Sequence, residues 1–415
     1  MVASSREQCD VLIVGGGLVG SLLANALSTL QLSVVLVEAQ SVATLEQPSF
    51  DGRVTALANG SQRTLQQLGL WAAIRSEAQA IRHIHIGERG RFGAARIDAA
   101  EEGVAALGYT VENRVLGAAL WEPLAARQNF NCLAPATLTD FAVADGTVTA
   151  EVSVAGAERR IAARLMVAAD GARSRLRQAM GIAAQVDDYE QQAIIVNCAT
   201  EEPHAGRAFE RFTPDGPLAV LPLTGANRVA VVWTLPAKIA DQRLGLGDDE
   251  FRGALQAAFG YRLGCFNKIG RRDKHPLHRV LSDAVVGERT VLIGNAAIAL
   301  HPVAGQGFNL ALRDVAALAE VIADAQSSGT GPVDAGAAEI LAAYRDWRAA
   351  DQRKLASFTH ALVRGFGAEL PGLSIARGAG LMAFDLVPGA KSLLARHTMG
   401  LAGRVPRLAR ALDLR

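Results

Sequence analysis

The sequence has few cysteines and almost no net charge, and each shortage excludes a class of protein. Four cysteines occur in 415 residues, scattered without a C-x-x-C pair or a histidine at ligand spacing, which excludes a disulfide framework and a structural zinc site. His83 and His85 alternate as on one strand face, but because a third ligand is lacking we expect no metal. The formal net charge is +1, so no nucleic-acid partner is expected.

Segments that suit a membrane are also scarce. Glu7 and Asp10 interrupt the start of the chain, so we expect no signal peptide. Residues 290–312 carry no formal charge and are long enough to span a membrane, yet they include histidine, proline, glutamine and asparagine, which lipid would not satisfy. We therefore expect a reduced, cytoplasmic protein, with peripheral contact with the inner membrane left as an open alternative.

What the sequence does have is a dinucleotide-binding pattern at its start. Residues 10–14 are an apolar run typical of a buried parallel strand, followed by a G-x-G-x-x-G turn and an Ala/Leu-rich helix. Such a turn lets the backbone approach a pyrophosphate at a helix N-terminus. Glu38 ends the second strand, where a carboxylate accepts ribose hydroxyls and disfavours a 2′-phosphate, so FAD or NAD is favoured over NADP. The residues expected to hold the dinucleotide here are Gly15, Gly17, Leu18, Val19, Gly20 and Glu38.

Two further segments decide between the dinucleotides. Residues 164–174 read as a strand running into an Asp-Gly turn, and residues 291–297 as a strand ending in Gly-Asn, followed by a glycine-rich segment, 301–309. Together with the first turn they resemble the three fingerprints of the para-hydroxybenzoate-hydroxylase-like flavin monooxygenases. The spacing matches that family from Asp10 to about Arg348.

Three more segments narrow the resemblance, namely 50–57, 111–114 and 210–222. They are similar to the ubiquinone-biosynthesis aromatic hydroxylases, and most similar to the 2-polyprenyl-6-methoxyphenol hydroxylase branch. The resemblance implies an FAD enzyme that hydroxylates the aromatic ring of a polyprenylated phenol through a flavin C4a-hydroperoxide, with O2 as cosubstrate and NAD(P)H or another electron donor. It also implies other ubiquinone-biosynthesis proteins as partners.

The resemblance assigns roles to individual residues. A helix opening at 305–309 would point its N–H groups at the flavin N1–C2=O edge, where negative charge develops. His301 is expected to pack or hydrogen-bond beneath the ring, with acid–base catalysis as the alternative. The catalytic set so implied is His301, Pro302 and Gly305. The further flavin contacts implied are Arg53, Arg114, Asp170, Asn295, Gly305, Gln306, Gly307, Phe308 and Asn309.

Asn295 departs from the wider family, which usually has an aspartate there. The family's aspartate accepts a hydrogen bond from the flavin ribityl chain. An asparagine accepts through its carbonyl oxygen, so the geometry can survive while one negative charge is lost. The resemblance implies that asparagine is a feature of this hydroxylase branch; the alternative is a flavin site that has decayed.

The expected fold class is α/β, a para-hydroxybenzoate hydroxylase fold with three parts. A Rossmann-like FAD-binding domain is discontinuous because strand-like segments separated by turns interrupt it. Those segments suit an antiparallel β-sheet substrate domain, and a C-terminal helical region follows. The expected boundaries are 1–75, 105–180 and 280–330 for the FAD domain, 76–104 and 181–279 for the sheet domain, and 337–415 for the helical region.

The substrate side and the tail each leave two interpretations open. Apolar residues on the expected sheet strands suit a prenylated phenol or an ordinary sheet core; they are Phe209, Phe212, Leu221, Pro222 and Trp233. Residues 371–415 carry seven basic against two acidic residues. This segment is either a helix packed on the flavin domain or a docking surface for anionic lipid or an acidic partner.

Two other functions fit the same motifs. A halogenase or a prenyl reductase can share the fold, although the four tryptophans stand singly, without the paired tryptophans of halogenases. A flavin-binding structural subunit of a biosynthetic complex would bind FAD without turning over. Substrate-dependent oxygen uptake distinguishes that subunit from an enzyme.

Overall fold

The apolar run at the start of the chain becomes the centre of a largely parallel sheet in the computed structural model, which describes residues 7–41, 53–301, 305–329, 331–367 and 388–414. Strand β1 pairs in parallel with β11 on one side and β2 on the other. The sheet runs in the order β17-β18-β11-β1-β2-β8, with a β9–β10 hairpin added antiparallel to β11. Its strands are β1 (Glu7–Val14), β2 (Val34–Val37), β8 (Phe130–Leu133), β9 (Ala136–Ala144), β10 (Thr147–Val154), β11 (Ala157–Ala168), β17 (Val286–Gly287) and β18 (Thr290–Leu292).

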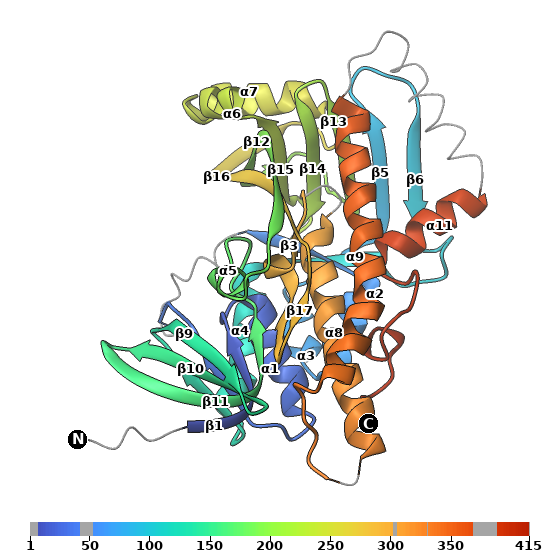
Figure 1. Cartoon of the computed structure of the whole chain (residues 1–415). Coiled ribbons are helices and arrows are strands. Elements are labelled where there is room, and N and C mark those ends of the chain that lie inside the picture. The colour runs from blue at the N-terminus through green and yellow to red at the C-terminus, as the bar shows by residue number, and fades with distance from the viewer. Residues whose placement is uncertain (1–6, 42–52, 302–304, 330, 368–387, 415) are drawn as a thin grey trace.

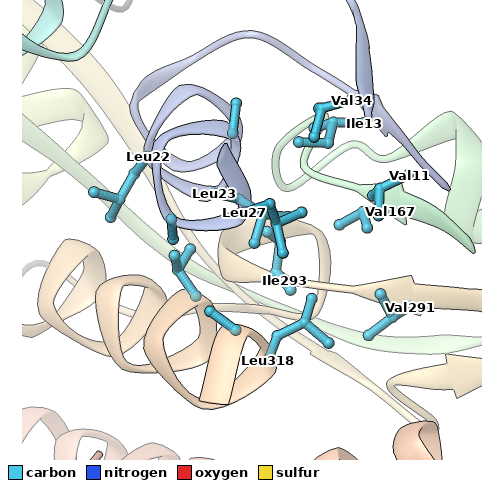
Figure 2. Packing of buried hydrophobic residues seen from close by; sticks show 14 of the residues in the cluster. Val11, Ile13, Leu22, Leu23, Leu27, Val34, Val167, Val291, Ile293 and Leu318 are labelled. Atoms are coloured by element: carbon cyan, nitrogen blue, oxygen red, sulfur yellow. The ribbon is translucent and has the colours of Figure 1, made fainter. Parts of the chain in front are cut away.

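Helices pack on this sheet and enclose the main core. Figure 2 shows Leu23 and Leu27 of α1 (Leu18–Ser28) packed with strand residues such as Ile13 and with Leu318 of α8 (Gln306–Ser328). These side chains are fully buried, and each contributes about 1.5–3 kcal/mol on transfer from water. The remaining helices of this part are α2 (Asn59–Gln67), α3 (Trp71–Ile74), α4 (Asn113–Ala125), α5 (Arg175–Ala179) and α9 (Ala338–Gly367).

The second large sheet stands above the first in Figure 1, in the order β19-β16-β12-β15-β14-β13-β5-β6. The antiparallel sheet expected from the sequence is correct except at one pair, because β13 and β5 run parallel. The β5–β6 hairpin comes from an early part of the chain and joins the sheet at its edge. The strands are β5 (His83–Glu88), β6 (Ala94–Asp98), β12 (Ala184–Thr200), β13 (Arg207–Thr213), β14 (Gly216–Pro222), β15 (Arg228–Pro236), β16 (Phe266–Ser282) and β19 (Ile298–Ala299).

One face of this sheet is covered by α6 (Ala237–Leu244) and α7 (Asp248–Phe259), which close a separate aromatic core around Trp233. The other face is left for the cavities described below. A small antiparallel sheet of β3 (Val54–Ala58), β7 (Gly108–Glu112) and β4 (Gln79–Ile81) completes the strands. The domain boundaries given above stay a prediction.

The described part of the C-terminal segment packs on the rest of the chain. In α11 (Pro388–Thr398), Ala395 joins a small apolar cluster with Ile97 of β6. Two basic side chains of the C-terminal segment contact the rest of the protein. Lys391 lies 3.3 Å from Glu101, and the Arg404 guanidinium stacks on Trp347 at 3.8 Å. Residues 371–387 and 415 of the predicted docking segment lie outside the described residues. No helix in the described ranges is both long and apolar enough to cross a membrane.

Candidate active site

The first glycine turn is built so tightly that side chains are excluded from it. Gly15 has φ +106°, and a Cβ there would lie 2.5 Å from the carbonyl oxygen of Ala169. A Cβ on Gly20 would lie 1.9 Å from the carbonyl oxygen of Gly15. The turn therefore brings bare backbone to the carboxyl edge of β1, and Gly17 begins α1 there without a side-chain cap. Uncapped N–H groups at a helix N-terminus attract an anionic group such as a pyrophosphate.

Glu38 lies directly after β2 and is fixed at this edge. Its Oε2 accepts a hydrogen bond from the backbone N–H of Gly16 at 2.6 Å, and its Oε1 accepts one from the N–H of Gln40 at 2.8 Å. The carboxylate thus stays beside the glycine turn, as expected for a group that receives ribose hydroxyls.

A cleft of about 530 Å³ runs from Glu38 to the start of α8. Most of the predicted cofactor residues line it, including both ends of the first turn and the segment after β18. Gly20 is not among the described lining residues, but it lies so close to Gly15 that a side chain would not fit between them. The predicted residues that line it are Gly15, Gly17, Leu18, Val19, Glu38, Arg53, Asp170, Asn295, Gly305, Gly307 and Phe308.

The side chain of Asp170 indicates that a ligand with hydroxyl groups fits this cleft. Its Oδ2 accepts a hydrogen bond from the N–H of Leu176 at 3.2 Å, whereas its Oδ1 is buried with no partner among the described residues. A buried carboxylate oxygen without a donor is costly. A ligand hydroxyl would supply that donor, so the cleft fits a dinucleotide.

The third motif forms a short turn that faces two cavities. Gly294 begins η2 (Gly294–Ala296) with φ +57°, and the exposed Asn295 lines both cavities. The N–H of Gly294 donates to the buried carboxylate of Asp314 on α8 at 3.2 Å. Asn295 is therefore presented from a turn that is fixed from behind.

Asn309 is held by hydrogen bonds within the protein, and its predicted flavin contact stays a prediction. Its Oδ1 accepts from the N–H of Ala58 at 2.8 Å and from the hydroxyl of Ser61 at 2.7 Å. Its Nδ2 donates to the carbonyl oxygens of Ala56 and Gly305, both at 2.8 Å. All four hydrogen-bonding positions of the amide are filled, so Asn309 positions β3 and the start of α8 beside the cleft.

His301 is buried beneath the same region. Its Nε2 lies 3.3 Å from Oε1 of Gln191, and Tyr189 meets the imidazole edge-on at 5.1 Å between centroids. Burial lowers the pKa of His301 to about 4, so the imidazole is neutral at pH 7. A neutral, enclosed imidazole suits the packing role expected for it better than proton delivery at neutral pH. Pro302 lies outside the described residues.

The two predicted arginines lie in different places. Arg53 lines both cavities. Arg114 is exposed, and its Nε lies 2.7 Å from Oε2 of Glu112. Among the described residues that line the cleft Arg114 does not occur, so its flavin contact stays a prediction.

A second cavity, of about 460 Å³, adjoins the cleft and is mostly aliphatic. The two share lining residues that include Arg53, Ile195, Asn295 and Gly305. Of the apolar residues singled out in the sequence, Phe209 and Leu221 line this cavity. Trp233 instead packs against Phe251 at 6.0 Å between ring centroids, and Phe212 and Pro222 are buried but are not among its described lining residues.

Sequence reasoning missed much of the aliphatic wall. It consists of residues from β4, β5, β6 and the segment before β7, namely Ile81, Ile84, Ile86, Ile97 and Leu107. The alternation of Ile84 and Ile86 with two histidines was a visible signal for one apolar strand face. Gln306 and Asn309 from α8 and Thr398 from α11 also line the cavity.

The chain matches a known protein family over most of its length. Residues 8–359 match the family model described as FAD binding domain. The chain belongs to this family. Ubiquinone hydroxylase UbiL of Rhodospirillum rubrum is 37% identical, over 100% of this chain and 95% of the relative. The 3-demethoxyubiquinol 3-hydroxylase of Escherichia coli is 32% identical, over 96% of this chain and 100% of the relative.

Solved structures agree on the fold. The p-nitrophenol 4-monooxygenase PnpA of Pseudomonas putida superposes with a TM-score of 0.78 at 20% identity, covering 96% of this chain and 100% of that one. The predicted fold class, a para-hydroxybenzoate hydroxylase fold, is confirmed. Because the chain belongs to this family, its cofactor is FAD, and O2 is the cosubstrate of such flavin monooxygenases.

The residues present fit FAD. The Gly15 turn and the N-terminus of α1 would hold the pyrophosphate, while Glu38 and Asp170 would accept hydroxyl donors. When bound, FAD supplies the oxygen-activating redox chemistry. The protein adds a helix N-terminus at α8, where Gly305 is in the left-handed region with φ +60° and no side-chain cap is present. This helix N-terminus would stabilise negative charge in the cleft, and the aliphatic lining of the second cavity would exclude water.

Proposed function

We propose that this protein hydroxylates the aromatic ring of a polyprenylated phenol in ubiquinone biosynthesis, using FAD and O2. The observation that carries the proposal is the aliphatic cavity that shares Arg53, Asn295 and Gly305 with the lining of the FAD cleft. Relatives named as ubiquinone hydroxylases align over nearly the whole chain. The substrate ring would lie at the junction near Asn295 and Gly305, with the prenyl tail along the aliphatic wall.

The wall matches a prenyl tail in chemistry. Three isoleucines of the β5–β6 hairpin, Ile84, Ile86 and Ile97, present branched aliphatic carbon to the cavity. Each buried methylene group contributes about 0.8 kcal/mol, so even one prenyl unit adds several kcal/mol of binding. A small polar phenol gains none of this, which favours a prenylated substrate over an unprenylated one.

A deletion experiment tests this function. The gene would be removed from a ubiquinone-producing host and the accumulating quinone precursor identified by mass spectrometry. We expect a prenylated precursor that lacks one ring hydroxyl, and restoration of ubiquinone by the wild-type gene. Unchanged ubiquinone, or accumulation of a fully hydroxylated precursor, contradicts the proposal.

Two alternatives have distinct outcomes. A flavin-binding structural subunit would restore ubiquinone in the deletion host without substrate-dependent oxygen uptake by the purified protein. A hydroxylase or reductase of another aromatic or prenyl substrate would leave ubiquinone unchanged. The lining residues that the two cavities share favour turnover, because they would bring a bound substrate next to the flavin.

We further propose a cytoplasmic protein in peripheral contact with the inner membrane, where a prenylated substrate resides, and an association with other ubiquinone-biosynthesis proteins. NAD(P)H or another donor would reduce the FAD. The predicted docking segment, 371–415, would contribute less to membrane binding than its basic residues suggest, because Lys391 and Arg404 contact the rest of the protein. Arg396 and Leu393 on α11 remain exposed and available.

A further inference from the structure

The tip of the β5–β6 hairpin carries an unusual surface. Phe92 is 94% exposed and directly follows Arg91, and Arg89 lies three residues before Phe92. A fully exposed phenylalanine is unfavourable in water. In Figure 1 the hairpin stands at the upper end of the molecule, at the edge of the second sheet and far from β1.

Neighbouring elements extend the same surface. The N–H of Arg89 donates to the carbonyl oxygen of Phe212 at 2.8 Å, which holds the tip beside the end of β13. There, Nη2 of Arg211 reaches within 3.8 Å of where a Cβ on Gly260 would lie. Directly after Gly260 follow Tyr261, which is 72% exposed, and Arg262. The arginine–aromatic surface is defined as Arg89, Arg91, Phe92, Arg211, Tyr261 and Arg262.

Positive charge is concentrated on this surface without full compensation. Burial, together with the nearby Arg262 and Arg89, lowers the pKa of Arg211. Its Nε is buried and has no hydrogen-bond partner among the described residues. Acidic side chains do occur on the adjoining segments, Glu88, Glu201 and Asp215, but the surface has four arginines. It therefore favours an anionic partner that also accepts aromatic side chains.

The hairpin connects this surface to the substrate cavity. Ile84 and Ile86 of β5 and Ile97 of β6 line the aliphatic cavity, while the tip of the same hairpin projects Phe92 outward. Aromatic residues flanked by arginine are typical of proteins that dip into the headgroup region of a bilayer.

We propose that the arginine–aromatic surface docks on an anionic phospholipid bilayer and holds the aliphatic cavity next to the lipid from which a prenylated phenol enters. The delivery of that substrate rests on the function proposed above, whereas the docking itself does not. Arginines bind the phosphate groups, and Phe92 and Tyr261 enter the interface.

The test is vesicle flotation of the full-length, FAD-loaded protein. Vesicles of phosphatidylcholine alone are compared with vesicles that also contain phosphatidylglycerol, at low salt and at 0.5 M NaCl. Each interfacial arginine contributes about a factor of five to partitioning. The double variant Arg89→Glu/Arg91→Glu should therefore partition at least about 25-fold more weakly onto anionic vesicles, and Phe92→Ser should weaken binding at both salt concentrations.

The matched control is Arg127→Glu/Arg159→Glu, which makes the same charge change at exposed positions after α4 and on β11, outside the arginine–aromatic surface. It should partition within about threefold of the wild type, since charges beyond a Debye length of about 10 Å are screened. All variants should retain FAD. The proposal is overturned if the wild type binds neutral vesicles as strongly as anionic ones. It is also overturned if the tip variant, Arg89→Glu/Arg91→Glu, binds like the wild type, or if the control variant loses as much binding. Competition by poly-glutamate as strong as that of anionic vesicles would assign the surface to an acidic protein and also overturn it.

Hydroxylation rates distinguish a failure of membrane docking from a failure of the proposed function. With a water-soluble, short-chain phenol the tip variant should keep the wild-type kcat, and with a long-chain phenol dissolved in vesicles its rate should fall. If neither phenol is hydroxylated by the wild type, the proposed function fails while the flotation result stands on its own. A tip variant that hydroxylates the vesicle-dissolved phenol at the wild-type rate contradicts delivery from the bilayer.

Discussion

The buried carboxylate of Asp314 accepts a hydrogen bond from the backbone N–H of Gly294 at 3.2 Å and so ties α8 to the turn that presents Asn295. On its other oxygen, Asp314 receives Nε of Arg348 at 2.8 Å and Nε2 of Gln352 at 3.1 Å. The side chains of Asp314 and Arg348 are 0% exposed. The geometry of the FAD cleft thus depends on an ion pair that has no contact with solvent.

Arg348→Met should destabilise the protein strongly. Burial already raises the pKa of Asp314, and loss of Arg348 leaves that carboxylate without its counter-charge. Removing one partner of a buried pair costs about 3–5 kcal/mol, which urea unfolding would measure. The double variant Asp314→Leu/Arg348→Met should recover part of the loss. A single-variant loss below about 1 kcal/mol would show that the pair does not stabilise the fold.

Asn309→Leu should weaken FAD binding because it loosens the backbone beside the cleft. The leucine leaves the N–H of Ala58 and the carbonyl oxygen of Gly305 unpaired, at about 1–3 kcal/mol for each buried group. β3 and the start of α8 should then separate, and flavin fluorescence titration should report a higher Kd. Asn309→Asp, which keeps two acceptor bonds, should be intermediate; an unchanged Kd in both variants would exclude the positioning role.

Glu38→Ala should release FAD while the fold persists. The carboxylate borders the cleft and already anchors the N–H of Gly16. Hydrogen bonds to charged groups contribute about 1.5–3 kcal/mol, so the Kd for FAD should rise about 10- to 100-fold. Glu122→Ala, an exposed glutamate on α4, is the control. Wild-type flavin occupancy in Glu38→Ala would refute the assignment of the dinucleotide site.

His301 should make stability depend on pH. Its pKa is lowered from 6.5 to about 4 by burial, so the unfolded chain binds this proton more readily and stability rises with pH between these values. Between pH 7.5 and pH 5 the wild type should therefore lose about 2 kcal/mol more than His301→Gln. Urea titrations of both proteins at the two pH values give this difference. Parallel losses would mean that the imidazole is solvated.

The sequence predicted the parts whose signal is local. The strand, glycine turn and helix around Gly15 share one continuous pattern, and strands β12 to β15 lie within 181–279, where strand-like segments were expected. Helix α8 begins after Gly305, as the glycine-rich segment indicated.

What could not be predicted depends on contacts between distant residues. Asp314 and Arg348 are 34 residues apart, and a lone charge on an amphipathic helix normally faces solvent. Whether Ile84 and Ile86 line a cavity depends on the parallel pairing of β5 with β13, which neither strand encodes alone. The hydrogen bonds of the Asn309 amide could not be predicted either, because they depend on where Ala58 and Ser61 lie in the folded chain.

The most direct test of the central claim is oxygen transfer by the purified, FAD-loaded protein under 18O2, with a reduced electron donor and a polyprenylated phenol. We predict one 18O atom in a new ring hydroxyl, and a lower KM for the prenylated phenol than for the same phenol without its tail. Incorporation that requires no prenylated substrate, or reduced flavin reoxidised without any labelled product, would contradict the assignment of the two adjoining cavities to FAD and a prenylated phenol.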